Sequence, residues 1–223
     1  MTRRTRIALK TGVWAACLAP LAVLLWRAVA DDLGANPIAF ITNWLGRWAM
    51  RYLLASLALT PIRLVSGAGW PITLRRLLGL FAFFYAALHF GVWIVLDHFF
   101  AWGQMGADIV KRPFITVGVT ALALLLPLAA TSTAGMIRRL GGRTWNRLHR
   151  LVYVASVLAV LHFVWLAKVG RLEQYLYAAI LATLLGIRAV DAARRYLARR
   201  REPRAAMPAA ARAGALPRRD DFC

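Results

Sequence analysis

The 223-residue chain has few acidic residues, few cysteines and few histidines. Nine Asp and Glu stand against 29 Lys and Arg, so the formal net charge is +20. The two cysteines, Cys17 and Cys223, cannot form a disulfide framework, and no CxxC or Cys/His spacing indicates a zinc or iron–sulfur site. No acidic residue lies well inside an apolar run, which argues against a proton relay built on buried carboxylates.

Apolar residues, in contrast, are abundant. They make up 61% of the chain, only 17% of residues are charged, and the mean hydropathy is +0.58. A soluble domain has about 25% charged residues, and a basic nucleic-acid-binding protein would not carry so much apolar surface. Nine Trp and ten Phe exclude a disordered basic chain. The composition therefore predicts an integral membrane protein whose apolar residues contact lipid, with no nucleic-acid partner.

Six apolar runs are long enough to cross about 30 Å of hydrocarbon as helices. No alternating strand pattern competes with them, so we predict an all-α, six-helix transmembrane bundle over residues 1–193. Proline and glycine separate the runs, with Pro113 at a helix start and Gly141 in a turn. The predicted spans are residues 11–30, 44–65, 75–97, 113–131, 148–167 and 174–193.

The distribution of basic residues predicts the direction of the bundle. With these spans, 22 of the 29 Lys and Arg fall on one side of the membrane, the side of both termini. Since cytoplasmic loops carry the excess of Lys and Arg, both termini are predicted to be cytoplasmic. A competing interpretation treats residues 1–30 as a signal peptide cleaved after 28–30 (Ala-Val-Ala), which would leave five spans. Residues 194–223, with nine arginines, are predicted to form a disordered cytoplasmic tail near anionic lipid headgroups.

The four histidines are the ionisable residues that stand out against this background. His89 and His162 fall at similar depths in the third and fifth spans, and His149 falls near the inner end of the fifth. An ionisable side chain at membrane depth indicates a functional site. His98 follows Asp97 at the outer boundary, where an ordinary interfacial histidine is the better interpretation.

Two neutral imidazoles at one depth on neighbouring helices suit the two axial positions of a haem. Each would bind through one ring nitrogen while the other nitrogen donates a hydrogen bond that sets the tautomer. From spacing alone, a hydrogen-bonded histidine pair and another metal site remain open alternatives. His149 lies about 20 Å along the helix from His162, which is the separation of two stacked haems.

Several sequence words resemble one known family. They are GRWAMR (46–51), LTPIR (59–63), RRLLGLF (75–81), YAALHF (85–90), KRPFITVG (111–118), LPLAATST (126–133) and WNRLHRLVY (145–153). In this order they are similar to the haem-binding membrane subunit of the bacterial periplasmic methionine sulfoxide reductase system (MsrQ, also YedZ), part of the ferric reductase-like transmembrane group. The resemblance covers about residues 10–192.

The resemblance implies a b-type haem subunit of the bacterial inner membrane that converts no substrate itself. It would accept electrons from the quinone pool or a cytoplasmic flavin reductase and pass them to a periplasmic molybdopterin subunit, which reduces methionine sulfoxide in damaged proteins. The family's motif histidines match His89, His149 and His162, which are the expected cofactor and metal ligands. FMN is a further cofactor implied by the family alone.

The sequence departs from the wider ferric reductase group at one point. That group carries two histidines on each of two helices, whereas the inner partner for His149 falls near Arg75 or Arg76. A second haem on His149 would need a different sixth ligand. Alternative functions are a stand-alone ferric reductase-like cytochrome with another acceptor and a non-redox membrane transporter or structural protein.

Overall fold

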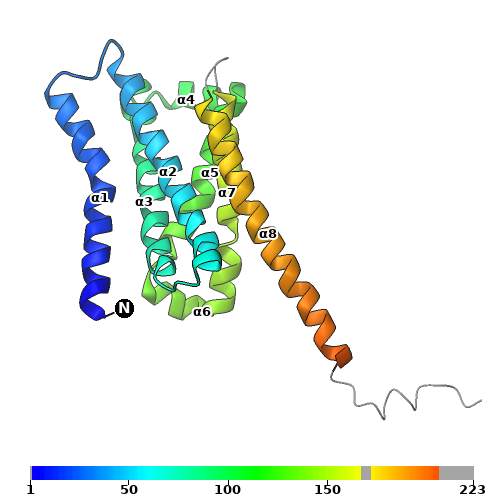
Figure 1. Cartoon of the computed structure of the whole chain (residues 1–223). Coiled ribbons are helices and arrows are strands. Elements are labelled where there is room, and N and C mark those ends of the chain that lie inside the picture. Colours follow the sequence, from blue (N-terminus) through cyan, green and yellow to red (C-terminus); the bar gives the residue numbers. More distant parts are fainter. Residues whose placement is uncertain (1, 167–171, 206–223) are drawn as a thin grey trace, which may run out of the picture. The chain divides into compact units, whose positions relative to one another are not determined.

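Helices joined by short loops form the described part of the chain, and no strand occurs in it. The computed structural model describes residues 2–166 and 172–205. The chain divides into two compact units, residues 1–184 and 185–223. The helices are α1 (Arg3–Val29), α2 (Pro37–Ser66), α3 (Pro71–Val92), the π-helix η1 (Trp93–Asp97), α4 (Trp102–Lys111), α5 (Pro113–Ala130), α6 (Ala134–Leu148), α7 (Leu151–Trp165) and α8 (Glu173–Ala205). Figure 1 labels α1 to α8.

The all-α prediction is confirmed, but the count of six spans is not. Four helical stretches of the described residues are long and apolar enough to cross a membrane: Ile7–Val29, Pro71–Asp97, Pro113–Ala130 and Glu173–Ala198. A fifth results if α6 and α7, which meet at a bend of 46°, form one span. The predicted span 44–65 is part of the 30-residue helix α2, whose apolar sequence is interrupted by arginines 47, 51 and 63. The cytoplasmic placement of the termini stays a prediction.

Two closely packed helix pairs, α2 with α3 and α5 with α7, form the centre of the first unit. Helix α3 also contacts α5, and α2 contacts α7, so that the two pairs face each other. The short helices α4 and α6 lie at opposite ends of this bundle (Figure 1). A core of buried residues joins the helices; among its members are Leu45, Leu53, Phe81, Tyr85, Leu125 and Ala155.

Local sequence signals explain where the two pairs begin. The Asn36 side chain accepts a hydrogen bond from the Ala39 amide and caps α2, and Pro37 takes the first helical position. Pro113 likewise opens α5, as the sequence predicts. Because both helices start at the end of the bundle where α4 lies, their first turns lie at the same level.

Helix α1 is attached to the bundle through its backbone carbonyls. The hydroxyls of Tyr52 and Tyr85 both donate to the Cys17 carbonyl, at 3.1 and 2.8 Å, and the Trp44 indole donates to the Pro20 carbonyl at 3.0 Å. Pro20 lies inside α1 and removes one helical hydrogen bond there. These contacts bury the Cys17 side chain, which is 2% exposed.

The second unit contains the remainder of α8. This helix continues through Ala205, beyond residue 193, where the last span is predicted to end. An ion pair between Arg195 and Asp191, at 3.0 Å and one turn apart, supports this part of the helix. The rest of the predicted tail, residues 206–223, lies outside the described residues.

Candidate functional site

His89 of α3 and His162 of α7 face each other across the centre of the first unit. Their ring centroids are 6.4 Å apart, and the ring planes are inclined at 75°. The two residues belong to different helix pairs, so the interface between the pairs brings them together. The sequence places these histidines at similar depths, and the structure makes them neighbours.

One nitrogen of each ring is bound by the backbone of the partner helix. His89 Nδ1 lies 2.9 Å from the Thr42 carbonyl of α2, and His162 Nδ1 lies 2.7 Å from the Phe114 carbonyl of α5. A carbonyl oxygen only accepts, so Nδ1 carries the hydrogen and Nε2 keeps its lone pair. Among the described residues, no protein group hydrogen-bonds to either Nε2. Both imidazoles are therefore oriented for ligation through Nε2.

Two glycines make room for these imidazoles. A Cβ on Gly46 of α2 would stand 3.1 Å from His89 Nδ1, and one on Gly118 of α5 would stand 2.8 Å from His162 Nδ1. Each glycine lies one helical turn after the carbonyl that holds the ring. A missing side chain at that position leaves the carbonyl open to a donor from the neighbouring helix. The two helix pairs thus share one arrangement, in which a backbone carbonyl and a glycine on one helix orient a histidine on the other.

A cavity of about 290 Å³ opens between the two pairs and includes both histidines in its lining. This volume is at the lower end of the range for ligand-binding sites. Leu53, Ala82 and Leu125 line its inner part and are 7% exposed or less. Polar and charged residues line its other end, near α4: Asn43, Arg47, Asp97 and Arg112.

The geometry fits a haem held by two axial histidines. Imidazoles that bind one metal from opposite sides, each through a bond of about 2 Å, have ring centroids about 6 Å apart. The observed 6.4 Å agrees with that value. The hydrogen-bonded Nδ1 is the usual second contact of a metal-binding histidine, and the macrocycle supplies the other ligands. Apolar walls around the histidines match the apolar body of a porphyrin.

His149 is separate from this cavity. It lies between α6 and α7, stacked on Trp145 with ring centroids 3.8 Å apart. Its Nδ1 lies 3.1 Å from the Trp145 carbonyl, and its Nε2 lies 3.4 Å from the Ser132 hydroxyl. The structure therefore does not bring the three predicted site histidines together, because His149 is at the α6 end of α7. A second hollow, of about 510 Å³, lies at the start of α6 and is lined by Thr133, Gly135, Met136, Arg138 and Arg139.

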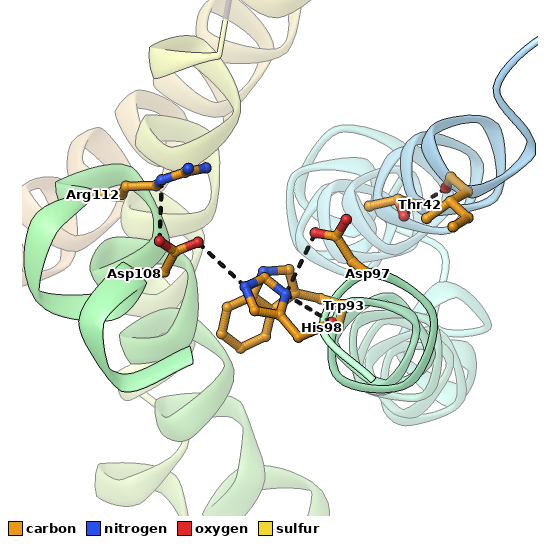
Figure 2. Close-up of polar contacts among 7 residues, drawn as sticks. Thr42, Trp93, Asp97, His98, Asp108 and Arg112 are labelled. Carbon is orange, nitrogen blue, oxygen red and sulfur yellow. Dashed lines mark hydrogen bonds and ion pairs between the residues drawn. The ribbon is translucent and has the colours of Figure 1, made fainter. Parts of the chain in front are cut away.

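His98 lies beside the cavity in a network of charged groups (Figure 2). Its Nε2 is 3.3 Å from Asp108 of α4, its Nδ1 is 3.6 Å from Asp97, and its ring contacts Trp93. Its side chain is 11% exposed. Asp108 also pairs with Arg112 at 3.4 Å. The π-helix η1, a form often found at functional sites, carries Trp93 and Asp97 into the cavity lining.

The sequence alone does not indicate the roles of the two glycines, the two carbonyls and the charged residues at the polar end of the cavity. Thr42 and His89 are 47 residues apart, and Phe114 and His162 are 48 residues apart, so no local motif links them. The nearly equal separations between each carbonyl residue and its histidine are a sequence signal that could have indicated this shared arrangement. Arg47 and Arg112 lie within two of the family-like sequence words, but the sequence assigns them no role at a cavity.

Comparison with known proteins defines the class first. The family model described as "Ferric reductase like transmembrane component" matches residues 45–160, which include α3 and α5 in full and most of α2 and α7. Together with the apolar helices, this match makes the chain a multi-pass membrane protein of the ferric reductase-like class.

Close relatives define the family within that class. A protein of Rhodospirillum rubrum is 54% identical over 186 residues, covering 83% of this chain and 89% of the relative. One of Xanthomonas euvesicatoria is 49% identical over 215 residues, covering 93% and 98%. One of Ralstonia nicotianae is 48% identical over 184 residues, covering 81% and 84%. All three carry the name protein-methionine-sulfoxide reductase heme-binding subunit MsrQ. The chain belongs to the MsrQ family, which confirms the resemblance found in the sequence.

Proposed function

We propose that the chain is a b-type haem subunit that carries electrons across the bacterial inner membrane for a methionine sulfoxide reductase. The observation that carries this proposal is the pair formed by His89 and His162, which both line one cavity with their ring centroids 6.4 Å apart. The names of the relatives, heme-binding subunits of such a reductase, support the same conclusion.

The chain's residues bind and orient the cofactor in this proposal. His89 and His162 ligate it, and the carbonyls of Thr42 and Phe114 hold the two rings in the tautomer that ligation needs. Leu53, Ala82 and Leu125 surround its apolar body. The haem supplies a one-electron iron couple, and the chain contains no CxxC motif for covalent attachment, as expected for a b-type haem. The protein is an electron-transfer subunit with no substrate-converting site of its own.

The donor and the acceptor are assigned from the family. The relatives are named as subunits of a reductase, which supports a separate catalytic partner. We propose that this partner is a periplasmic molybdopterin protein that reduces oxidised methionine in other proteins. The quinone pool or a cytoplasmic flavin reductase supplies the electrons.

We assign one haem, bound between His89 and His162. A role for His149 as ligand of a second haem stays a prediction, because its Nε2 lies against the Ser132 hydroxyl rather than a second imidazole. FMN stays a prediction from the family, and we assign it no residues.

Electron transfer through the purified protein tests the proposal. In vesicles that contain the chain, addition of a quinol, or of NADH with a flavin reductase, should produce the absorption bands of a reduced b-type haem. Addition of the molybdopterin subunit with methionine sulfoxide should then reoxidise the haem. His98→Ala should behave like the wild type, because His98 lies outside the cavity lining.

Two results would contradict the proposal. Colourless protein from cells with ample haem would exclude a cytochrome and favour a non-redox membrane protein. A haem that both donors reduce but that the catalytic subunit does not reoxidise would favour a ferric reductase-like cytochrome with another acceptor.

A further inference from the structure

Two arginines lie at the polar end of the histidine cavity. Arg47 comes from α2, directly after Gly46, and Arg112 is the residue immediately before α5. They are the only Lys or Arg side chains among the described residues that line the cavity. They come from the two helices that hold the histidine rings, one arginine from each pair.

Among the described residues, no charged side chain lines the opposite end of the cavity. Its lining includes Leu53, Ala82 and Leu125, which are 3%, 1% and 7% exposed and belong to the packed core. An anionic group placed among them would lose its hydration without a partner, at a high cost in free energy. A ligand with one apolar edge and one anionic edge therefore has a single favourable orientation in this cavity.

The present contacts of the two arginines leave donors for a further anion. Arg47 meets Glu173 through one nitrogen at 3.6 Å, and Arg112 meets Asp108 through one nitrogen at 3.4 Å. A guanidinium carries five N–H donors in a planar fork that suits carboxylates. The two side chains are 33% and 57% exposed, so both can adjust their positions.

We propose that Arg47 and Arg112 bind the two carboxylates of the haem that His89 and His162 ligate, and so fix which edge of the haem faces the α4 end of the bundle. This inference rests on the proposed function, since it concerns the same cofactor. Asp108 contacts both Arg112 and His98 at the rim (Figure 2). The carboxylate edge then faces the side on which we place the catalytic partner.

Arg51 provides a matched control. It lies on α2 one turn after Arg47, but it donates to the Tyr177 hydroxyl at 2.9 Å and stacks on Trp48, and it does not line the cavity. Its replacement removes the same charge from the same helix without touching the proposed site.

The test compares haem with its dimethyl ester, in which both carboxylates are neutral. Protein prepared without haem is titrated with each compound, and affinity is followed through the Soret band. The wild type should bind haem more tightly than the ester. Arg47→Gln and Arg112→Gln should each reduce this preference about tenfold, as expected for loss of one charge-assisted hydrogen bond. Arg51→Gln should retain the wild-type preference.

Equal binding of haem and its ester by the wild type would overturn this inference. If Arg47→Gln and Arg112→Gln keep the wild-type preference, or lower the affinity for haem and ester equally, the two arginines do not bind the carboxylates. The proposed function would survive this result as long as both compounds still give a bis-histidine spectrum. If the wild type binds neither compound, the proposed function fails, and the present inference fails with it.

Discussion

Gly118 and Gly46 determine how closely a neighbouring helix approaches a functional histidine. Their role differs from that of a glycine in a turn, because both lie inside regular helices, where glycine costs about 1 kcal/mol relative to alanine. That cost is offset by access of the imidazole to a backbone carbonyl. The contact at Gly118 is the tighter one, since a Cβ there would stand 2.8 Å from His162 Nδ1, against 3.1 Å at the equivalent position by His89.

Gly118→Ala should displace the His162 ring and weaken haem binding. A 2.8 Å contact forces the ring or the helix to move, and overpacking of this kind costs about 1–3 kcal/mol, which corresponds to a loss of about tenfold or more in affinity. Gly46→Ala should have a smaller effect in the same direction. Haem titration of the purified variants measures both.

Gly91→Ala is the control for these substitutions. Gly91 lies on α3 close to His89, but a Cβ there would meet nothing within 4 Å. This variant should bind haem as the wild type does. Equal haem affinity in all three variants would show that the glycines do not position the histidines.

At the scale of single residues, the sequence predicts the histidines but not what holds them. His89 and His162 stand out because ionisable groups are rare in apolar spans, and counting from the span ends gives their depth. The carbonyls of Thr42 and Phe114 carry no side-chain signal, and their role depends on which helices pack together. A single sequence therefore indicates the candidate ligands but not the backbone carbonyls that hold their rings.

At the scale of elements, α1 makes few contacts with the rest of the bundle. Its described attachments include three side-chain donors on α2 and α3 that reach its carbonyls, two of them at Cys17. Hydrogen bonds between membrane helices contribute about 0.6 kcal/mol on average. Attachment of α1 thus depends on a few identifiable groups.

Tyr52→Phe and Tyr85→Phe should each destabilise the protein by about 0.6–1 kcal/mol, and the double variant by about 1–2 kcal/mol. The ring of each tyrosine remains, so only the hydroxyl donor to the Cys17 carbonyl is lost. Equilibrium unfolding in mixed detergent measures the change. Tyr175→Phe, at a side chain that is 58% exposed, should leave stability unaltered. A double variant as stable as the wild type would show that these bonds do not hold α1.

The ends of the helices and the bend between α6 and α7 also show what the sequence does not predict. The predicted fifth span, 148–167, corresponds to α7, which begins at Leu151, and residue 167 lies outside the described residues. The bend of 46° between α6 and α7 depends on packing at the end of the bundle, which hydropathy does not record. The predicted break at Gly141 is present, since this residue has φ 72° inside α6.

At the scale of the whole molecule, successive long helices run in opposite directions, so the short helices α4 and α6 connect them at different ends. The two short helices lie at opposite ends of the bundle in the first unit (Figure 1). The basic-residue count predicts that the α6 end faces the cytoplasm and the α4 end faces outward. Composition and the distribution of charge predict a membrane protein and this direction. Which helix pairs contact each other is visible only in the folded structure.

Cysteine labelling tests the direction of the molecule. In a Cys223→Ser background, the exposed positions Lys111 and Arg143 are replaced singly by cysteine. Cys17 is buried and should stay unlabelled. An impermeant maleimide should label Lys111→Cys in intact spheroplasts and should label Arg143→Cys only after permeabilisation. Labelling of both positions from one side, or in the reverse order, would contradict the predicted topology.

The central claim is that His89 and His162 bind one haem iron from opposite sides. The most direct measurement is the electron paramagnetic resonance spectrum of the ferric protein. Ring planes inclined at 75° predict a low-spin signal of strong anisotropy, as expected for nearly perpendicular axial imidazoles. His162→Ala should lose this signal and give high-spin iron or no haem. A high-spin wild-type spectrum, or a low-spin signal that survives in His162→Ala, would contradict the account.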